Sequence, residues 1–132
     1  MFWKIYFIGL VVFLAIDAIW LGLIAKNFYQ KYMGVLMKSN INWLAAFLVY
    51  ALFIVGLTLF VIMPGLDKKS LINVLVLGGL FGLVAYGVYD LTNLATLKQW
   101  TLVVTVVDML WGMVVGALVS GVTYLLVLKF FL

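Results

Sequence analysis

Three aspartates lie inside long apolar stretches of this sequence, where a charged side chain is not expected. They are Asp17, Asp90 and Asp108. An acid near the centre of a membrane-spanning helix raises the free energy of insertion by at least about 2.5 kcal/mol. Three such acids therefore indicate a structural or functional role. Protonatable carboxyls in a helical bundle are suited to lining a path for a substrate or for protons.

Each aspartate has possible hydrogen-bond donors near it at helical spacing. A carboxyl group in hydrocarbon must find donors or become neutral, so we expect the helix faces that carry these residues to point at one another. We also expect at least one of the three carboxyls to be protonated at neutral pH. The predicted substrate-binding or proton-binding cluster comprises Asp17, Asp90, Asp108, Asn93, Tyr86, Tyr89, Trp20, Trp111, Thr92 and Thr105.

The residue types that are missing limit the chemistry. There is no cysteine and no histidine, which removes disulfides, thiol nucleophiles, imidazole bases and nearly every zinc, haem or iron–sulfur ligand set. We therefore expect no metal and no cofactor, and the sequence assigns no catalytic residue. The spacing of the acids over three apolar stretches does not rank one of them as a base or an acid.

The elements that carry these residues are predicted to be transmembrane helices. Hydrophobic residues make up 69% of the 132 residues and charged residues only 9%, a composition that no water-soluble domain of this size can bury. Four apolar stretches are long enough to cross a bilayer. We predict an all-α polytopic integral membrane protein, a single transmembrane domain over residues 1–132, with spans at about 4–26, 43–63, 71–95 and 101–128.

The connections between the spans lead to further expectations. Residues 27–42 are polar and aromatic and are predicted to form a loop at the membrane boundary, and Pro64 with Gly65 is predicted to end the second span. The second span contains almost nothing polar and is expected to be scaffold. Ser70 is predicted to cap the third span. Small residues four apart in the third and fourth spans (Gly78 and Gly82; Gly112, Gly116 and Ser120) predict close helix packing.

Four spans place both termini on one side of the membrane and the three aspartates in the half that contains the first and third loops. The net charge of +4 comes from eight lysines and four aspartates. The lysines flank the apolar stretches in small groups, as interface anchors for membrane lipids do, and they form no surface for nucleic acid. They divide equally between the two sides, so the positive-inside rule selects no orientation.

Three short strings carry a family resemblance. They are DAIWLG at residues 17–22, YDLTNLATLKQW at 89–100 and VDMLWG at 107–112. They resemble the signatures of a small bacterial family of four-span membrane proteins that is catalogued as domain of unknown function 2177, and the likeness covers essentially the whole chain. The resemblance implies a compact four-span unit in the bacterial inner membrane, and it implies nothing about chemistry.

These observations favour a protein that binds or transports a small or lipid-like molecule, with coupling to protons. The short chain also favours a homodimer. Two alternatives stay open: an intramembrane enzyme or accessory subunit that acts on lipids, with Asp90 and Asp108 as the carboxyl pair to test, and a structural partner in a larger membrane complex. In the simplest alternative the polar groups only fix the packing of the bundle.

Overall fold

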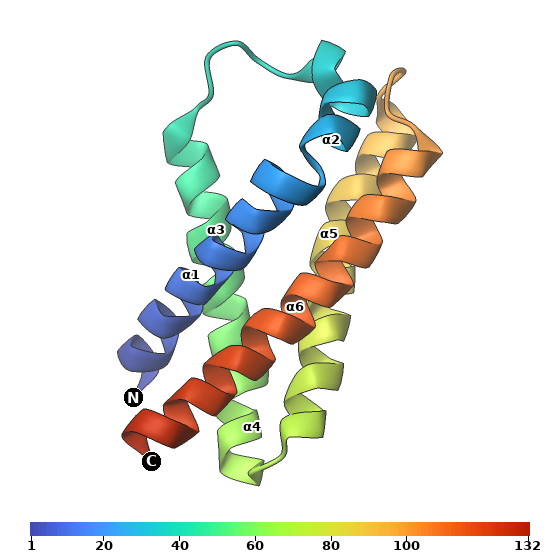
Figure 1. Ribbon diagram of the computed structural model, residues 1–132. Coiled ribbons are helices and arrows are strands. Elements are labelled where there is room, and N and C mark those ends of the chain that lie inside the picture. The colour runs from blue at the N-terminus through green and yellow to red at the C-terminus, as the bar shows by residue number, and fades with distance from the viewer.

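Four long helical runs form most of the molecule, which confirms the predicted all-α membrane bundle. They cover Phe2–Ile24, Trp43–Lys68, Leu71–Thr96 and Leu102–Phe131. The computed structural model describes all residues from 1 to 132, and each of the four runs is apolar and long enough to span a membrane. Figure 1 shows both termini at one end of the bundle, as four spans require. The helices are α1 (Phe2–Ile19), α2 (Lys26–Met33), α3 (Trp43–Leu57), α4 (Met63–Lys68), α5 (Leu71–Thr96) and α6 (Leu102–Phe131).

Side-chain caps set the first residues of three spans. The side chains of Asn42, Ser70 and Thr101 each accept a hydrogen bond from the backbone N–H three residues later, at 3.1, 3.2 and 3.2 Å. Such caps satisfy amide groups that have no partner inside the helix. The predicted cap at Ser70 is therefore confirmed.

The prediction that Pro64 ends the second span is wrong. The helical run continues from α3 through a π-helical turn at Thr58–Ile62 and then through α4 to Lys68. A proline ring in a helix normally collides with the carbonyl group one turn earlier, and the wider π-helical turn makes room directly before the ring. The run ends at Lys69, whose backbone is left-handed with φ of 52°.

The segment predicted as the first loop also contains helix. A π-helical turn at Trp20–Ile24 extends α1, and α2 follows it after Ala25. A short 3₁₀ turn then leaves residues 37–42 as the connection to α3. Helical structure satisfies the backbone of this segment, which lies at the membrane boundary beside hydrocarbon that offers no hydrogen bonds.

Helices α5 and α6 are packed backbone to backbone. A methyl group added at Gly82 would collide with the backbone of Gly112, and one added at Gly116 would collide with the backbone of Gly78. The close packing predicted from these small residues is confirmed, because any side chain at these positions would push the helices apart.

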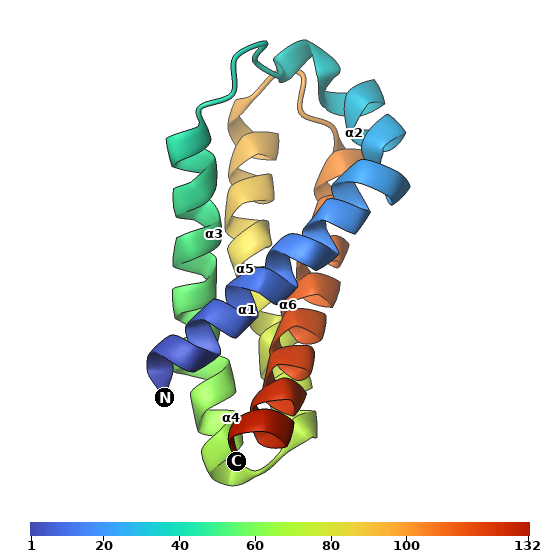
Figure 2. The ribbon, with the colours of Figure 1, turned by 60° about the vertical axis from the view of Figure 1, so that its left-hand side comes forward.

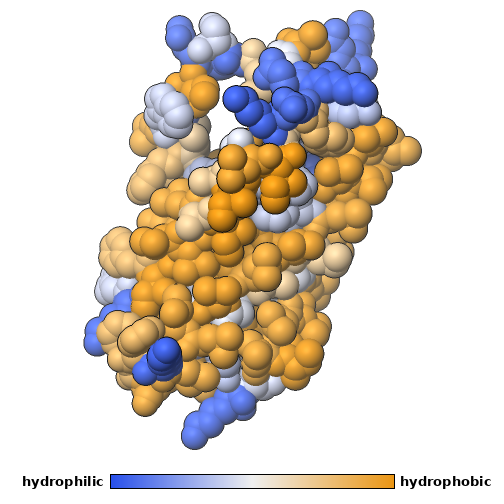
Figure 3. Space-filling view, in the orientation of Figure 1, coloured by the Kyte–Doolittle hydropathy of each residue, from blue (hydrophilic) through white to orange (hydrophobic).

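Helices α1 and α3 diverge toward the end where α2 lies. Both ribbon views show them close together near the N-terminus and apart at the opposite end (Figures 1 and 2). The apolar core, with Ile5, Ile54, Leu57, Val115 and Val119 fully buried, fills the bundle below this divergence. Apolar side chains also cover the outer surface that faces lipid (Figure 3).

Substitution of Gly82 by alanine is expected to destabilise the bundle. Gly82→Ala should lower the free energy of unfolding by about 1–3 kcal/mol, because the added methyl group overpacks the contact with α6. The measurement is loss of helical circular dichroism in mixed micelles as sodium dodecyl sulfate is increased. Gly22→Ala is the control, since a methyl group there meets no atom within 4 Å. Equal stability of the two variants would contradict the close contact.

Candidate functional site

A cavity of about 750 Å³ lies where α1 and α3 diverge. Its 19 lining residues come from α1 to α3, α5, α6 and the segments that connect them. Of these, 17 are hydrophobic, and the remaining two are Asp17 and Asp108. Figure 3 shows a hollow at this end of the molecule, below the hydrophilic connection between α2 and α3. The cavity therefore has apolar walls and two acids.

Asp17 is held by donors from two other helices. The Tyr50 hydroxyl of α3 donates a hydrogen bond to one carboxyl oxygen of Asp17. The indole N–H of Trp111 in α6 donates a longer bond of 3.4 Å to the other oxygen. The side chain is only 6% exposed, so these two donors replace the water that the carboxyl group loses.

Asp108 is held by a donor from α2. The Tyr29 hydroxyl donates to Asp108 Oδ1 at 2.7 Å and accepts a bond from the indole N–H of Trp20 at 3.1 Å. The rings of Trp20 and Trp111 stack with centroids 4.3 Å apart and planes within 6°. Hydrogen bonds and this stack thus join the two acids in one continuous network.

Tyr29 remains a donor at neutral pH. Burial raises the pKa of the Tyr29 phenol, and the adjacent Asp108 carboxylate raises it further, because both disfavour a second negative charge. The helix α2, which lies in the segment predicted to be a loop, therefore supplies a permanent hydrogen-bond donor to an acid of α6.

Asp90 has a different environment. Its side chain is completely buried, and neither carboxyl oxygen accepts a hydrogen bond from any donor group. The Asp108 carboxyl lies within hydrogen-bonding reach of it. Asp90 does not line the cavity, whereas its neighbour Asp108 does. The acids are not gathered as a group of three that could hold a metal ion.

Some of the other predicted cluster residues line the cavity, and the rest lie outside it. Trp20, Trp111, Tyr86 and Tyr89 line the cavity with the two acids. Thr105 is buried behind the wall, where its hydroxyl accepts a 3.1 Å bond from the indole N–H of the cavity residue Trp100.

Thr92 and Asn93 lie outside the cavity wall. The Thr92 hydroxyl is exposed and donates to the Val88 carbonyl of its own helix, so it does not reach any of the acids. Asn93 lies beside Tyr89 and does not line the cavity.

Two tyrosines that contact the acids directly are missing from the predicted cluster. The expectation that the second span is only scaffold is wrong, because its Tyr50 is a partner of Asp17. Tyr50 carries the only hydroxyl in the half of that span nearer to α2, which is a signal that could have found it. Tyr29 had no comparable signal, since its contact depends on how α2 folds back toward α6.

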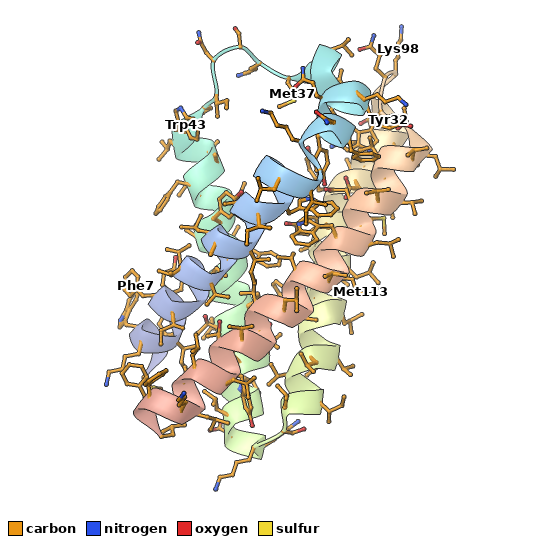
Figure 4. The ribbon with its side chains drawn as sticks, in the orientation of Figure 1. Phe7, Tyr32, Met37, Trp43, Lys98 and Met113 are labelled. Carbon is orange, nitrogen blue, oxygen red and sulfur yellow. The ribbon has the colours of Figure 1, made fainter.

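Residues at the rim mark the membrane boundary. Figure 4 shows Tyr32, Met37, Trp43 and Lys98 around the end of the bundle where α2 lies, a mixture of aromatic and basic groups that is typical of the interface. Phe7 points outward from the lower part of α1, and Met113 points outward from the middle of α6. The acids thus lie below this boundary, in the half of the membrane that contains α2.

The fold and the cavity define a multi-pass membrane protein of four spans with acids between them. The family model described as "Predicted membrane protein (DUF2177)" matches residues 2–125, and the chain belongs to this family. Neither the curated proteins nor the solved structures contain a match.

The bond between Tyr50 and Asp17 is expected to couple α1 to α3 energetically. In a double-mutant cycle, Tyr50→Phe and Asp17→Ala should show a coupling free energy of about 0.5–1.5 kcal/mol, the range of interhelical hydrogen bonds in membranes. Unfolding in mixed micelles gives the four stabilities. Tyr32→Phe replaces Tyr50→Phe in the control cycle, since Tyr32 does not bond Asp17. Additive effects of the first pair would show that the bond contributes nothing.

Proposed function

We propose that this protein binds a lipid-soluble small molecule in the cavity and transports it in exchange for protons. The observation that carries this proposal is the lining: apolar and aromatic walls around two acids and no other charged group. Such walls favour a hydrocarbon body, and the two carboxyls provide acceptors for its polar end.

The size of the cavity supports a ligand rather than packing alone. A volume of about 750 Å³ is within the usual range of small-molecule sites, whereas packing defects in protein interiors are near the size of a water molecule. A polar network that served only to fix helix positions would favour direct contact between the helices. Here the network borders an open volume.

The ligand enters from the bilayer. Leu21 at the end of α1, and Val49 and Leu52 of α3, line the cavity and are 44%, 66% and 73% exposed on the outer surface. These apolar side chains form the rim between the diverging helices, so a molecule dissolved in lipid reaches the site without crossing water.

Transport requires a second access route. Phe13, Phe53 and Phe81 lie together at the inner end of the cavity, with ring centroids 5.0 and 5.4 Å apart, and separate it from the other half of the bundle. We propose that a conformational change, within a homodimer in the bacterial inner membrane, exposes the site to the opposite half. The short chain and the family resemblance support this part of the proposal.

Occupancy of the cavity can be measured by tryptophan quenching. Trp3→Phe with Trp43→Phe removes the two strongly exposed tryptophans and leaves Trp20, Trp100 and Trp111, which all line the cavity. In maltoside micelles, 12-bromododecanol should quench this variant saturably, and unbrominated dodecanol should relieve the quenching. Asp108→Asn should weaken binding about tenfold, equivalent to about 1.4 kcal/mol, because the amide is a poorer acceptor for the hydroxyl group.

Asp67→Asn is the matched control, since Asp67 is an exposed acid of α4 at the far end of the bundle. With Asp67→Asn added, the variant that lacks Trp3 and Trp43 should bind 12-bromododecanol with an unchanged Kd. Quenching that rises linearly with the bromoalcohol and does not respond to dodecanol would show that this probe only dissolves in the micelle, and the cavity would then not be a site for a neutral lipid-soluble molecule.

A further inference from the structure

Asp90 is the one buried acid of the spans to which the hydrogen-bond network provides no donor. Asp17 and Asp108 accept bonds from tyrosine and tryptophan donors. Asp90 is 0% exposed, both of its oxygens lack a donor, and the group within reach is another carboxyl. A buried carboxylate in this position would have neither water nor a counter-charge.

One shared proton resolves this arrangement. Two carboxyl groups can hydrogen-bond each other only when one of them is protonated, and the pair then carries one negative charge instead of two. The titratable groups that face the pair are Asp17, Tyr29, Tyr86 and Tyr89. Tyrosines are neutral donors in this setting, and no lysine faces the pair, so the protein itself supplies no cation to replace the proton.

The cavity next to this pair is suited to a positive charge. Asp108 lines it directly, more than half of its lining residues are aromatic, and none of them is basic. The stacked rings of Trp20 and Trp111 lie between the two acids of the lining. Aromatic faces and a carboxylate together attract organic cations when water is excluded.

We propose that the ligand is a lipophilic organic cation that displaces the proton shared by Asp90 and Asp108. This inference rests on the proposed function and names its substrate class. On binding, the O–H bond of the carboxyl pair breaks, the proton goes to water, and the cation takes its place beside Asp108. One positive charge leaves and one enters, so the net charge of the site does not change. Asp90 holds the exchangeable proton, and Asp108 contacts the ligand.

The exchange is tested with three probes that share one chain and differ in the head group. These are 12-bromododecyltrimethylammonium, 12-bromododecanol and 12-bromododecyl sulfate. The quaternary ammonium has no proton to lose, so any released proton comes from the protein. With the wild-type chain in weakly buffered maltoside micelles, a pH indicator should report release of about one proton per bound ammonium probe near neutral pH, after subtraction of empty micelles.

The pH dependence of binding has a defined sign. A proton competes with the cation, so the Kd of the ammonium probe should fall with rising pH, by at most about tenfold per unit. The alcohol should show no such dependence, and the sulfate should not bind saturably. In Asp90→Asn, the amide can donate to Asp108 permanently, and the ammonium probe should bind without proton release and with a Kd that no longer follows pH.

The outcomes separate this inference from the proposed function. Saturable binding of the ammonium probe without proton release in the wild-type chain would overturn the exchange. So would saturable binding of the alcohol with none of the ammonium. The first result would leave the cavity as a cation site without proton exchange, and the second would leave it as a site for a neutral ligand. If no probe binds saturably, the proposed function itself fails. The wild-type comparison of the three head groups decides the question even where Asp90→Asn does not fold.

Discussion

A carboxyl group inside a membrane must obtain its hydrogen-bond partners from the protein, and much of this structure follows from that constraint. Asp17 of α1 takes donors from α3 and α6, and Asp108 of α6 takes its donor from α2. No donor comes from the helix that carries the acid. Each of these two acids therefore holds a neighbouring element in place, and together they connect the elements at the diverging end of the bundle.

The two ends of the bundle are held by different forces. Glycines let α5 and α6 touch along their backbones, and the apolar core closes the end near the termini. At the other end, α1 and α3 separate (Figure 2), and the polar network, the packing of Phe13 against Tyr50 and the fold of α2 connect them beside the cavity. A few hydrogen bonds are easier to break and re-form than a close-packed interface, so motion of the bundle is expected to be concentrated in α1, α2 and α3.

Much of the architecture could be predicted from composition and spacing, whereas the contacts within the site could not. Lipid imposes a simple rule on hydropathy and length, so four spans, common termini and the contact of Gly82 with α6 all followed from the sequence. The partners of the acids depend on rotation of each helix about its axis. That rotation is weakly encoded here, because α1 and α3 are apolar on nearly every face. Tyr50 looked like one aromatic among many, and the fold of α2 that brings Tyr29 to Asp108 left no periodic signal. The path of the chain through Pro64 depended on a π-helical turn that no local pattern announces.

Three residues of one type have acquired three different environments. Asp17 has a donor on each oxygen and is the most fully satisfied, so its main effect is to hold α1 against α3 and α6. Asp108 has one strong donor and borders both the cavity and Asp90, so its free acceptor sites face the cavity on one side and another carboxyl on the other. Asp90 has no donor and does not line the cavity, which is why we assign the exchangeable proton, and not the ligand contact, to this acid. A single carboxyl can also exchange a proton for a cation when the two compete for it. In the proposed exchange the two tasks are divided between neighbouring acids: Asp108 borders the cavity and contacts the ligand, whereas Asp90, which does not line the cavity, holds the proton until the cation arrives.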